Sequence, residues 1–157
     1  DGQNGHNYTG ISKIMSQYGG PSNANMETIS KWLRDNPVVA RKIMNSNKSF
    51  VFFKETNGPG AIGALGYQVT PQISLAADPL YTPLGAPVWL WTNRVEASGL
   101  WIAQDTGGAI KGSNRFDSFW GAGRVAEQVA SGLYAKGQAL ILLPKISFDR
   151  LQNKAGK

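Results

Sequence analysis

Apolar residues in the first third of the chain recur at helical spacing. Three stripes with the i, i+3, i+4 repeat of one helix face predict three amphipathic helices. Their members are Ile11, Ile14, Met15 and Tyr18, then Met26, Ile29, Trp32 and Leu33, then Val39, Ala40, Ile43 and Met44. Gly19-Gly20-Pro21 ends the first helix, which covers about residues 9–18, and Asn36-Pro37 is typical of the start of the third. We interpret all three helices as structural.

From Ser49 onward, short β-branched and aromatic runs replace the helical spacing. Ser49–Glu55 predicts a strand. Turns rich in Gly and Pro separate the further strands, which we expect at residues 65–69, 73–77, 87–92, 100–104 and 138–143, with one helix at about 122–134. Many short strands joined by such turns are typical of a closed β-barrel. The pattern therefore predicts a mainly β chain with a helical lead-in.

This pattern divides the chain into three regions. Residues 1–48 form the helical lead-in, residues 49–144 the barrel portion, and residues 145–157, which hold four cationic residues, a solvated C-terminal tail. The length of 157 residues and the hydrophobic fraction of 41% exclude a disordered chain. No apolar run reaches the roughly 20 residues of a membrane span, so no integral membrane helix is predicted.

Charge and residue usage narrow the classes of function. The 16 Lys and Arg against 10 Asp and Glu give a net charge of +6, which permits a polyanionic partner. No basic block exists beyond Arg41-Lys42, so nucleic acid is not an expected partner. The chain has no Cys, and its one His, His6, is interpreted as a turn residue. These counts exclude a thiol nucleophile and disfavour a zinc site or a Ser-His-Asp triad, so we expect no metal and no cofactor.

Three of the six aspartates have distinctive settings. Asp78 and Asp105 end apolar strands, and Asp117 lies in the aromatic segment Arg115–Gly121. A carboxylate at such a place has a raised pKa unless it is hydrogen-bonded, and a raised carboxylic acid suits general acid catalysis. The alternative is that each aspartate caps a turn through its own backbone, as Asp before Pro or Gly does. The residues alone leave both interpretations open.

Long motifs around these aspartates resemble one enzyme family. The matching segments are Asp78–Gly85 with Val88–Leu90, Gln104–Gly112, Arg115–Gly121, and, earlier in the chain, Asp1–Thr9 and Ser49–Phe53. They are similar to the three-aspartate domain of the lytic murein transglycosylase A family and to the sequence ahead of it. The resemblance covers nearly the whole chain. It implies a double-psi β-barrel and a bacterial cell-wall enzyme without a cofactor.

The resemblance also implies roles for individual residues. Asp117 takes the place of the catalytic acid/base, and Asp105 and Asp78 those of the two accompanying aspartates. Candidate substrate-binding residues surround them: Lys111, Asn114 and Ser118 as sugar or orienting contacts, Gly107 and Gly108 for close backbone approach to the sugar, and Trp120 for stacking. For Trp101 a place in the core is the better interpretation, because its strand is apolar.

The implied reaction cleaves the β-1,4 bond between N-acetylmuramic acid and N-acetylglucosamine without water and leaves a 1,6-anhydro-muramyl end. One acid suffices, because the attacking 6-hydroxyl is already part of the sugar and intramolecular attack has a high effective molarity. The implied partner is the peptidoglycan glycan strand, on the periplasmic side of the outer membrane. Members of the family have a long stretch before this point, so we expect a preceding segment of the same protein to complete the barrel and carry a lipid anchor.

Two other functions remain open at this stage. Asp105-Thr106-Gly107 after an apolar strand resembles the aspartic-peptidase triplet, in which two aspartates share one proton. Only one such triplet exists, so a homodimer would be required. The other alternative is a non-catalytic peptidoglycan-binding barrel, similar to expansin-type relatives of the fold, with purely structural aspartates.

Overall fold

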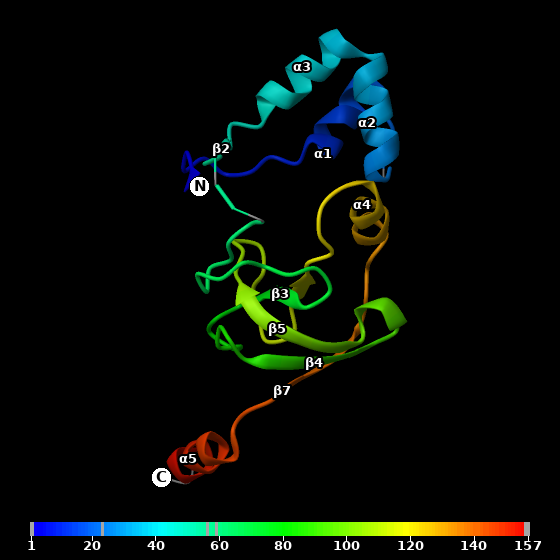
Figure 1. Ribbon diagram of the computed structural model, residues 1–157. Helices are drawn as coiled ribbons and strands as arrows, with labels where there is room; N and C mark the ends of the chain where they lie inside the picture. The colour runs from blue at the N-terminus through cyan, green and yellow to red at the C-terminus, as the bar shows by residue number, and fades with distance from the viewer. Residues whose placement is uncertain (1, 23, 56, 59, 156–157) are drawn as a thin grey trace. The chain divides into compact units, whose positions relative to one another are not determined.

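The computed structural model describes residues 2–22, 24–55, 57–58 and 60–155 (Figure 1). The chain separates into two compact units, Asp1–Asn57 and Gly58–Lys157. The first unit is helical and the second is built on a sheet. The boundaries 1–48, 49–144 and 145–157 that the sequence suggests remain predictions.

The first unit contains the three helices that the apolar stripes predict. They are α1 (Ile11–Met15), continued by the 3-10 turn η1 (Ser16–Tyr18), α2 (Met26–Asp35) and α3 (Pro37–Ser46). Asn25 caps α2 by accepting a hydrogen bond from the backbone N–H of Thr28 at 2.9 Å, which satisfies one of the otherwise unpaired donors. Met15, Ile29 and Ile43, one from each helix, are buried against one another. The helical periodicity of the sequence therefore identified this core correctly.

The strand expected at Ser49–Glu55 is mostly absent. Only β2 (Val51–Phe52) is paired, antiparallel to β1 (Gly2–Gln3). A strand exists only as far as it has a partner, and the partner in this unit is two residues long. Phe53 beyond it is 91% exposed, although its residue type favours a strand.

The second unit is built on a five-stranded sheet with the order β6-β3-β5-β4-β7. The strands are β3 (Ser74–Ala77), β4 (Pro87–Thr92), β5 (Gly99–Asp105), β6 (Phe116–Ser118) and β7 (Gly137–Ile141). Only the β3–β5 pair is parallel, and all other neighbours are antiparallel. The sheet is strongly twisted (Figure 1). The five strands confirm the prediction of a mainly β region that follows a helical region in the chain.

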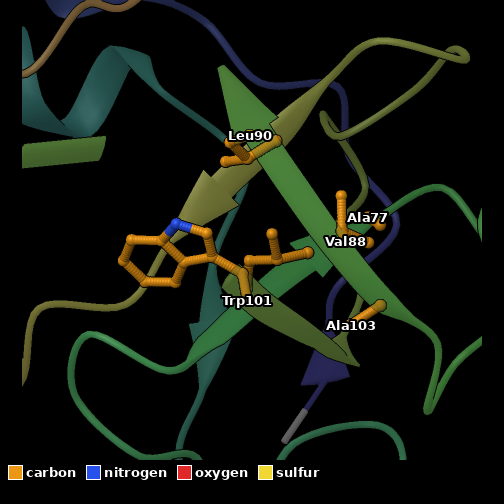
Figure 2. Packing of buried hydrophobic residues seen from close by; sticks show 6 residues of the cluster. Ala77, Val88, Leu90, Trp101 and Ala103 are labelled. Carbon is orange, nitrogen blue, oxygen red and sulfur yellow. The ribbon is translucent and has the colours of Figure 1, made fainter. Parts of the chain in front are cut away.

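One face of this sheet forms the core of the second unit. Alternate residues of β3, β4 and β5 point to the same side, as the period of two in a strand requires. The buried members are Leu75, Ala77, Val88, Leu90, Trp101 and Ala103 (Figure 2). Trp101 is 3% exposed and donates from Nε1 to the carbonyl oxygen of Ala97 at 3.0 Å. The interpretation of Trp101 as a core residue is therefore confirmed.

Several local predictions for the second unit differ from the structure. Residues 65–69 form no strand, because Gly66 has φ +86° and the segment makes a single bridge between Ile62 and Gln68. The late helix, α4, is shorter than expected, Arg124–Ser131. A turn, η2 (Val95–Ala97), and a further helix, α5 (Lys145–Ala155), complete the unit. Within the described ranges, no helix has both the length and the apolar character needed to cross a bilayer.

Candidate functional site

A cleft of about 610 Å³ lies in the second unit. Three parts of the chain line it: β6 with its flanking residues, the end of β4 with η2, and the segment that joins α4 to β7. Among the lining residues are Leu90, Thr92, Asn114, Arg115, Asp117, Ser118, Trp120, Tyr134, Lys136 and Gln138. Four of the predicted site residues, Asn114, Asp117, Ser118 and Trp120, therefore gather in one cleft.

Asp117 is the one acidic side chain among the described residues that line this cleft. It lies in the middle of β6, where backbone pairing with Ala76 of β3 fixes its position. Its Oδ1 accepts a hydrogen bond from Nε of Arg115 at 3.0 Å, and the two side chains are about half exposed. An ion pair this exposed contributes only about 0–1 kcal/mol. The sheet backbone, more than this ion pair, presents the carboxylate to a ligand in the cleft.

Asp105 is the last residue of β5 and lies outside the cleft lining. Its Oδ1 accepts a hydrogen bond from the backbone N–H of Ala64 at 3.0 Å. The register between β3 and β5 shifts just before Ala76, and this irregularity brings Asp105 opposite Ala76. Asp105 thus joins the loop around Ala64 to the end of the parallel strand pair.

Asp78 follows β3 and is 3% exposed. Its Oδ2 accepts from the backbone N–H of Gly112 at 2.9 Å, and its Oδ1 from that of Leu80 at 3.2 Å. The Gly112 hydrogen bond is the main cause that holds the pKa of Asp78 below its ordinary value; burial opposes it, while Leu80 and the charge of Lys111 act in the same direction. A lowered pKa does not suit a general acid. The hydrogen bond from Leu80 is a turn contact of the kind that the backbone-capping interpretation describes, and the part that Asp78 plays in the reaction remains a prediction.

The loop between β5 and β6 holds three more of the predicted site residues, none of them in the cleft lining. Lys111 lies close enough to Asp78 to lower its pKa. A Cβ at Gly107 would lie 2.8 Å from the terminal methyl group of Ile110, so a larger residue there would have to displace the end of that side chain. A Cβ at Gly108 would meet nothing within 4 Å. The proximity of these three residues to a bound sugar remains a prediction.

The three polar or aromatic residues that accompany Asp117 in the cleft are held by hydrogen bonds and ring packing. Nδ2 of Asn114 donates to the carbonyl oxygen of Gly137 at 3.1 Å, which links the two sides of the cleft. Nε1 of Trp120 donates to Oγ of Ser118 at 2.9 Å. The Trp120 ring packs edge-on against Trp101, with centroids 5.8 Å apart. Their side chains therefore have defined positions before any ligand binds.

Sequence reasoning did not single out Arg115, Tyr134 and Lys136, which also line the cleft. Arg115 could have been found, since residues two apart in a strand share a face and Asp117 follows at that spacing. Nζ of Lys136 lies 5.8 Å from the centre of the Tyr134 ring. The sequence predicts Tyr134 at the end of the late helix, whereas this helix ends at Ser131 and leaves Tyr134 in the connecting segment. In the part of the chain that the structure describes, His, Asp and Glu form no group of three that could hold a metal ion.

Comparison with protein-family models identifies two regions of the chain. Residues 1–54 match the model of the MltA specific insert domain, and residues 73–143 match the model of the 3D domain. The second region contains Asp78, Asp105 and Asp117 as well as all the described lining residues of the cleft. Both regions thus come from the type of protein that the sequence motifs indicate.

Individual relatives and solved structures are named as lytic murein transglycosylase A, or MltA. Membrane-bound lytic murein transglycosylase A of Vibrio cholerae is 31% identical over 134 residues, which are 78% of this chain and 36% of that protein. The crystal structure of MltA from Neisseria gonorrhoeae is 35% identical with a TM-score of 0.80, over 92% of this chain and 39% of that one. The structure of Escherichia coli MltA with bound chitohexaose is 27% identical with a TM-score of 0.77, over 89% and 45% of the two chains.

The chain thus spans about two fifths of the length of the relatives that it matches. The likeness nevertheless extends through the helical unit and the sheet unit alike. On these matches, the chain belongs to the lytic murein transglycosylase A family.

Proposed function

We propose that this chain carries the acid/base site of a peptidoglycan lytic transglycosylase. The enzyme cleaves the β-1,4 bond between N-acetylmuramic acid and N-acetylglucosamine and forms a 1,6-anhydro-N-acetylmuramic acid end. The observation that supports it most directly is the single carboxylate, Asp117, among the described residues that line the cleft. The membership of the lytic murein transglycosylase A family supports the choice of substrate.

One carboxylate suffices for this reaction but not for ordinary hydrolysis. A glycoside hydrolase uses a second carboxylate, either to activate a water or to form a covalent intermediate. In the proposed reaction, the carboxylic acid of Asp117 protonates the glycosidic oxygen and the C1–O bond breaks. The resulting carboxylate then takes the proton of the muramyl 6-hydroxyl while O6 bonds to C1. The proton that Asp117 gave is thereby replaced, and no water is consumed.

The other two aspartates support this site in the proposal. Asp105 holds the Ala64 loop, and Asp78 holds the loop between β5 and β6 at Gly112, through the hydrogen bonds described above. Both loops adjoin strands of the sheet that carries Asp117. Asp78 and Asp105 thus act as positioning residues, and Trp120 and Asn114 are the proposed sugar contacts.

The proposal extends to architecture and location. We propose that the five-stranded sheet is part of a double-psi β-barrel completed by sequence outside this chain, with a lipid anchor on that other sequence. The short outer strand β6, three residues long, supports completion, since an unpaired sheet edge is a pairing site. The Vibrio and E. coli relatives are named as membrane-bound. These names support a membrane-associated location, and we propose the periplasmic side of the outer membrane.

Digestion of purified cell walls in ¹⁸O-labelled water, followed by mass spectrometry of the fragments, tests the activity. We expect anhydro ends without label and no new reducing-end muramic acid. Label at the new anomeric carbon would show hydrolysis and overturn the transglycosylase proposal. Binding to cell walls without release of soluble fragments would favour the non-catalytic barrel instead. Inhibition by pepstatin of a peptidase activity would favour the aspartic-peptidase alternative.

A further inference from the structure

The cleft around Asp117 carries more positive than negative charge. Its charged lining residues are Arg115, Lys136 and Asp117. While Asp117 is ionised, its formal charge and that of Arg115, with which it is paired, cancel. Lys136 forms no ion pair with any described residue; its Nζ lies near the ring of Tyr134 instead. In this state the ammonium group of Lys136 is the one charge of the described cleft lining that no opposite charge balances.

The backbone of Lys136 is held in place by the residue that follows β4. Its N–H donates to Oδ1 of Asn93 at 2.8 Å, and its carbonyl oxygen accepts from the N–H of Asn93 at 2.9 Å. The next residue, Gly137, pairs with Thr92 at the end of β4. Arg94 adds a hydrogen bond from Nη1 to the carbonyl oxygen of Gly132 at 3.2 Å. Contacts from β4 and the turn after it thus fix the segment that brings Lys136 to the cleft.

We infer that Lys136 binds a carboxylate of the glycan strand and makes this cleft selective for muramyl over uncharged N-acetylglucosamine units. This inference rests on the proposed function, because it assumes that a glycan strand occupies the cleft. Muramic acid carries a lactyl carboxyl group, either free or extended by a peptide that has carboxylates of its own. N-acetylglucosamine carries no charge. A lysine ammonium is a flexible point charge and can follow a carboxylate on a flexible substituent.

Position and charge together support this role. The ring of Tyr134 keeps Nζ of Lys136 beside an aromatic face, where a cation is weakly stabilised until a carboxylate replaces this contact. Asp117 does not compete for Lys136 in the described structure, because its ion pair is with Arg115. Lys136 is therefore available to the substrate, and the lactyl substituent lies on the same sugar whose C1–O bond is broken. Recognition of this group would orient the muramyl unit toward Asp117.

Binding of short ligands that lack the scissile bond tests the inference without turnover. The probes are the disaccharide N-acetylglucosaminyl-N-acetylmuramic acid with its free carboxylate, the same disaccharide with the carboxyl converted to an amide, and the disaccharide with an attached peptide. NMR titration of the full chain gives each Kd. We expect the carboxylate disaccharide to bind about three- to tenfold more tightly than its amide, with a ratio that falls as salt is added. If the disaccharide with the attached peptide has a lower Kd than the disaccharide with the free lactyl carboxylate, the carboxylate that Lys136 binds is on the peptide.

Variants assign this preference to one side chain. Lys136→Gln should bring the ratio close to one without weakening binding of the amide, whereas Lys136→Arg should retain the preference. Lys145→Gln is the matched control, since Lys145 is exposed and outside the cleft lining and its loss removes the same charge. Equal binding of carboxylate and amide by the unmodified chain would overturn the inference, and so would an unchanged ratio in Lys136→Gln. The ¹⁸O experiment is independent: incorporated label with an intact ratio would refute transglycosylation but not carboxylate recognition.

Discussion

Asp105 and Asp117 lie on opposite sides of the same residue, because both pair with Ala76 in the central part of the sheet. With neighbouring strands about 4.8 Å apart, the Cα atoms of the two aspartates are separated by roughly 10 Å. β3, which carries Ala76, is fully buried. The two carboxylates are therefore carried on a rigid frame, yet their immediate partners differ: a backbone N–H for Asp105 and a guanidinium group for Asp117. These partners predict different consequences of substitution.

Asp117→Asn should remove turnover and leave the fold intact. The amide keeps the shape and can still accept the hydrogen bond from Arg115, but it cannot donate and regain a proton. General acid–base catalysis contributes roughly 10²–10⁴-fold, and one group serves both steps here, so the loss in kcat should lie at the upper end or beyond. Anhydro-fragment release measures the loss, and circular dichroism the fold. Asp149→Asn, on exposed α5, is the control. Turnover close to that of the unmodified enzyme would contradict the role given to Asp117.

Substitution of Asp105 should affect stability more than chemistry. Asp105→Ala leaves the N–H of Ala64 without its acceptor and should lower the free energy of unfolding by about 1 kcal/mol or somewhat more. Asp105→Asn keeps an acceptor oxygen and should lose less. Urea unfolding measures both variants. An Asp105→Asn enzyme that is fully folded but inactive, beside an active Asp117→Asn enzyme, would reverse the roles proposed for the two residues.

Asp78 should make the stability of the folded chain depend on pH in the acidic range. Its pKa is lowered in the folded state, so the ionised form stabilises the fold at pH values above the ordinary value of 3.8. This contribution is lost as the pH falls through the lower folded-state pKa. Asp78→Asn should therefore be less stable than the unmodified chain near neutral pH, and the difference should shrink below about pH 4. Thermal unfolding at a series of pH values measures it. A constant difference down to the lowest pH would contradict the assignment.

The sequence predicts those features that depend on neighbouring residues in the chain. The three helices of the first unit are examples, since the spacing of Met15, Ile29 and Ile43 within their own stripes is enough to identify the buried faces. The prediction fails where pairing with a distant segment decides the outcome. β6 is only three residues long and is a strand because β3 pairs with it. Ser49–Glu55 has a stronger strand composition but only a two-residue partner.

The candidate functional site likewise has some features that neighbouring residues in the sequence determine and others that distant segments determine. The motif around Asp117 identifies four cleft residues because they are close in sequence. The lowered pKa of Asp78 depends mainly on the N–H of Gly112, which lies 34 residues away in the sequence. Lys136 is brought to the cleft by Asn93, 43 residues away. Neither relationship leaves a local pattern in the sequence, so the lowered pKa of Asp78 and the place of Lys136 in the cleft could only be found from the fold.

Even the methyl group of an alanine at position 137 should destabilise the sheet. A Cβ there would overlap the carbonyl oxygen of Trp91 and lie 2.7 Å from Cα of Thr92, and both are backbone atoms of the paired strand β4. Because backbone cannot move aside as a side chain can, Gly137→Ala should lower the free energy of unfolding by about 1–3 kcal/mol. Gly132→Ala in the same connecting segment is the control, as its Cβ would meet only an ordinary contact at 3.9 Å. If β7 moves away from β4 to admit the methyl group, Lys136 moves with it, and carboxylate binding should weaken together with stability. Equal unfolding free energies for the two variants would mean that the β4–β7 pair is looser than the register indicates.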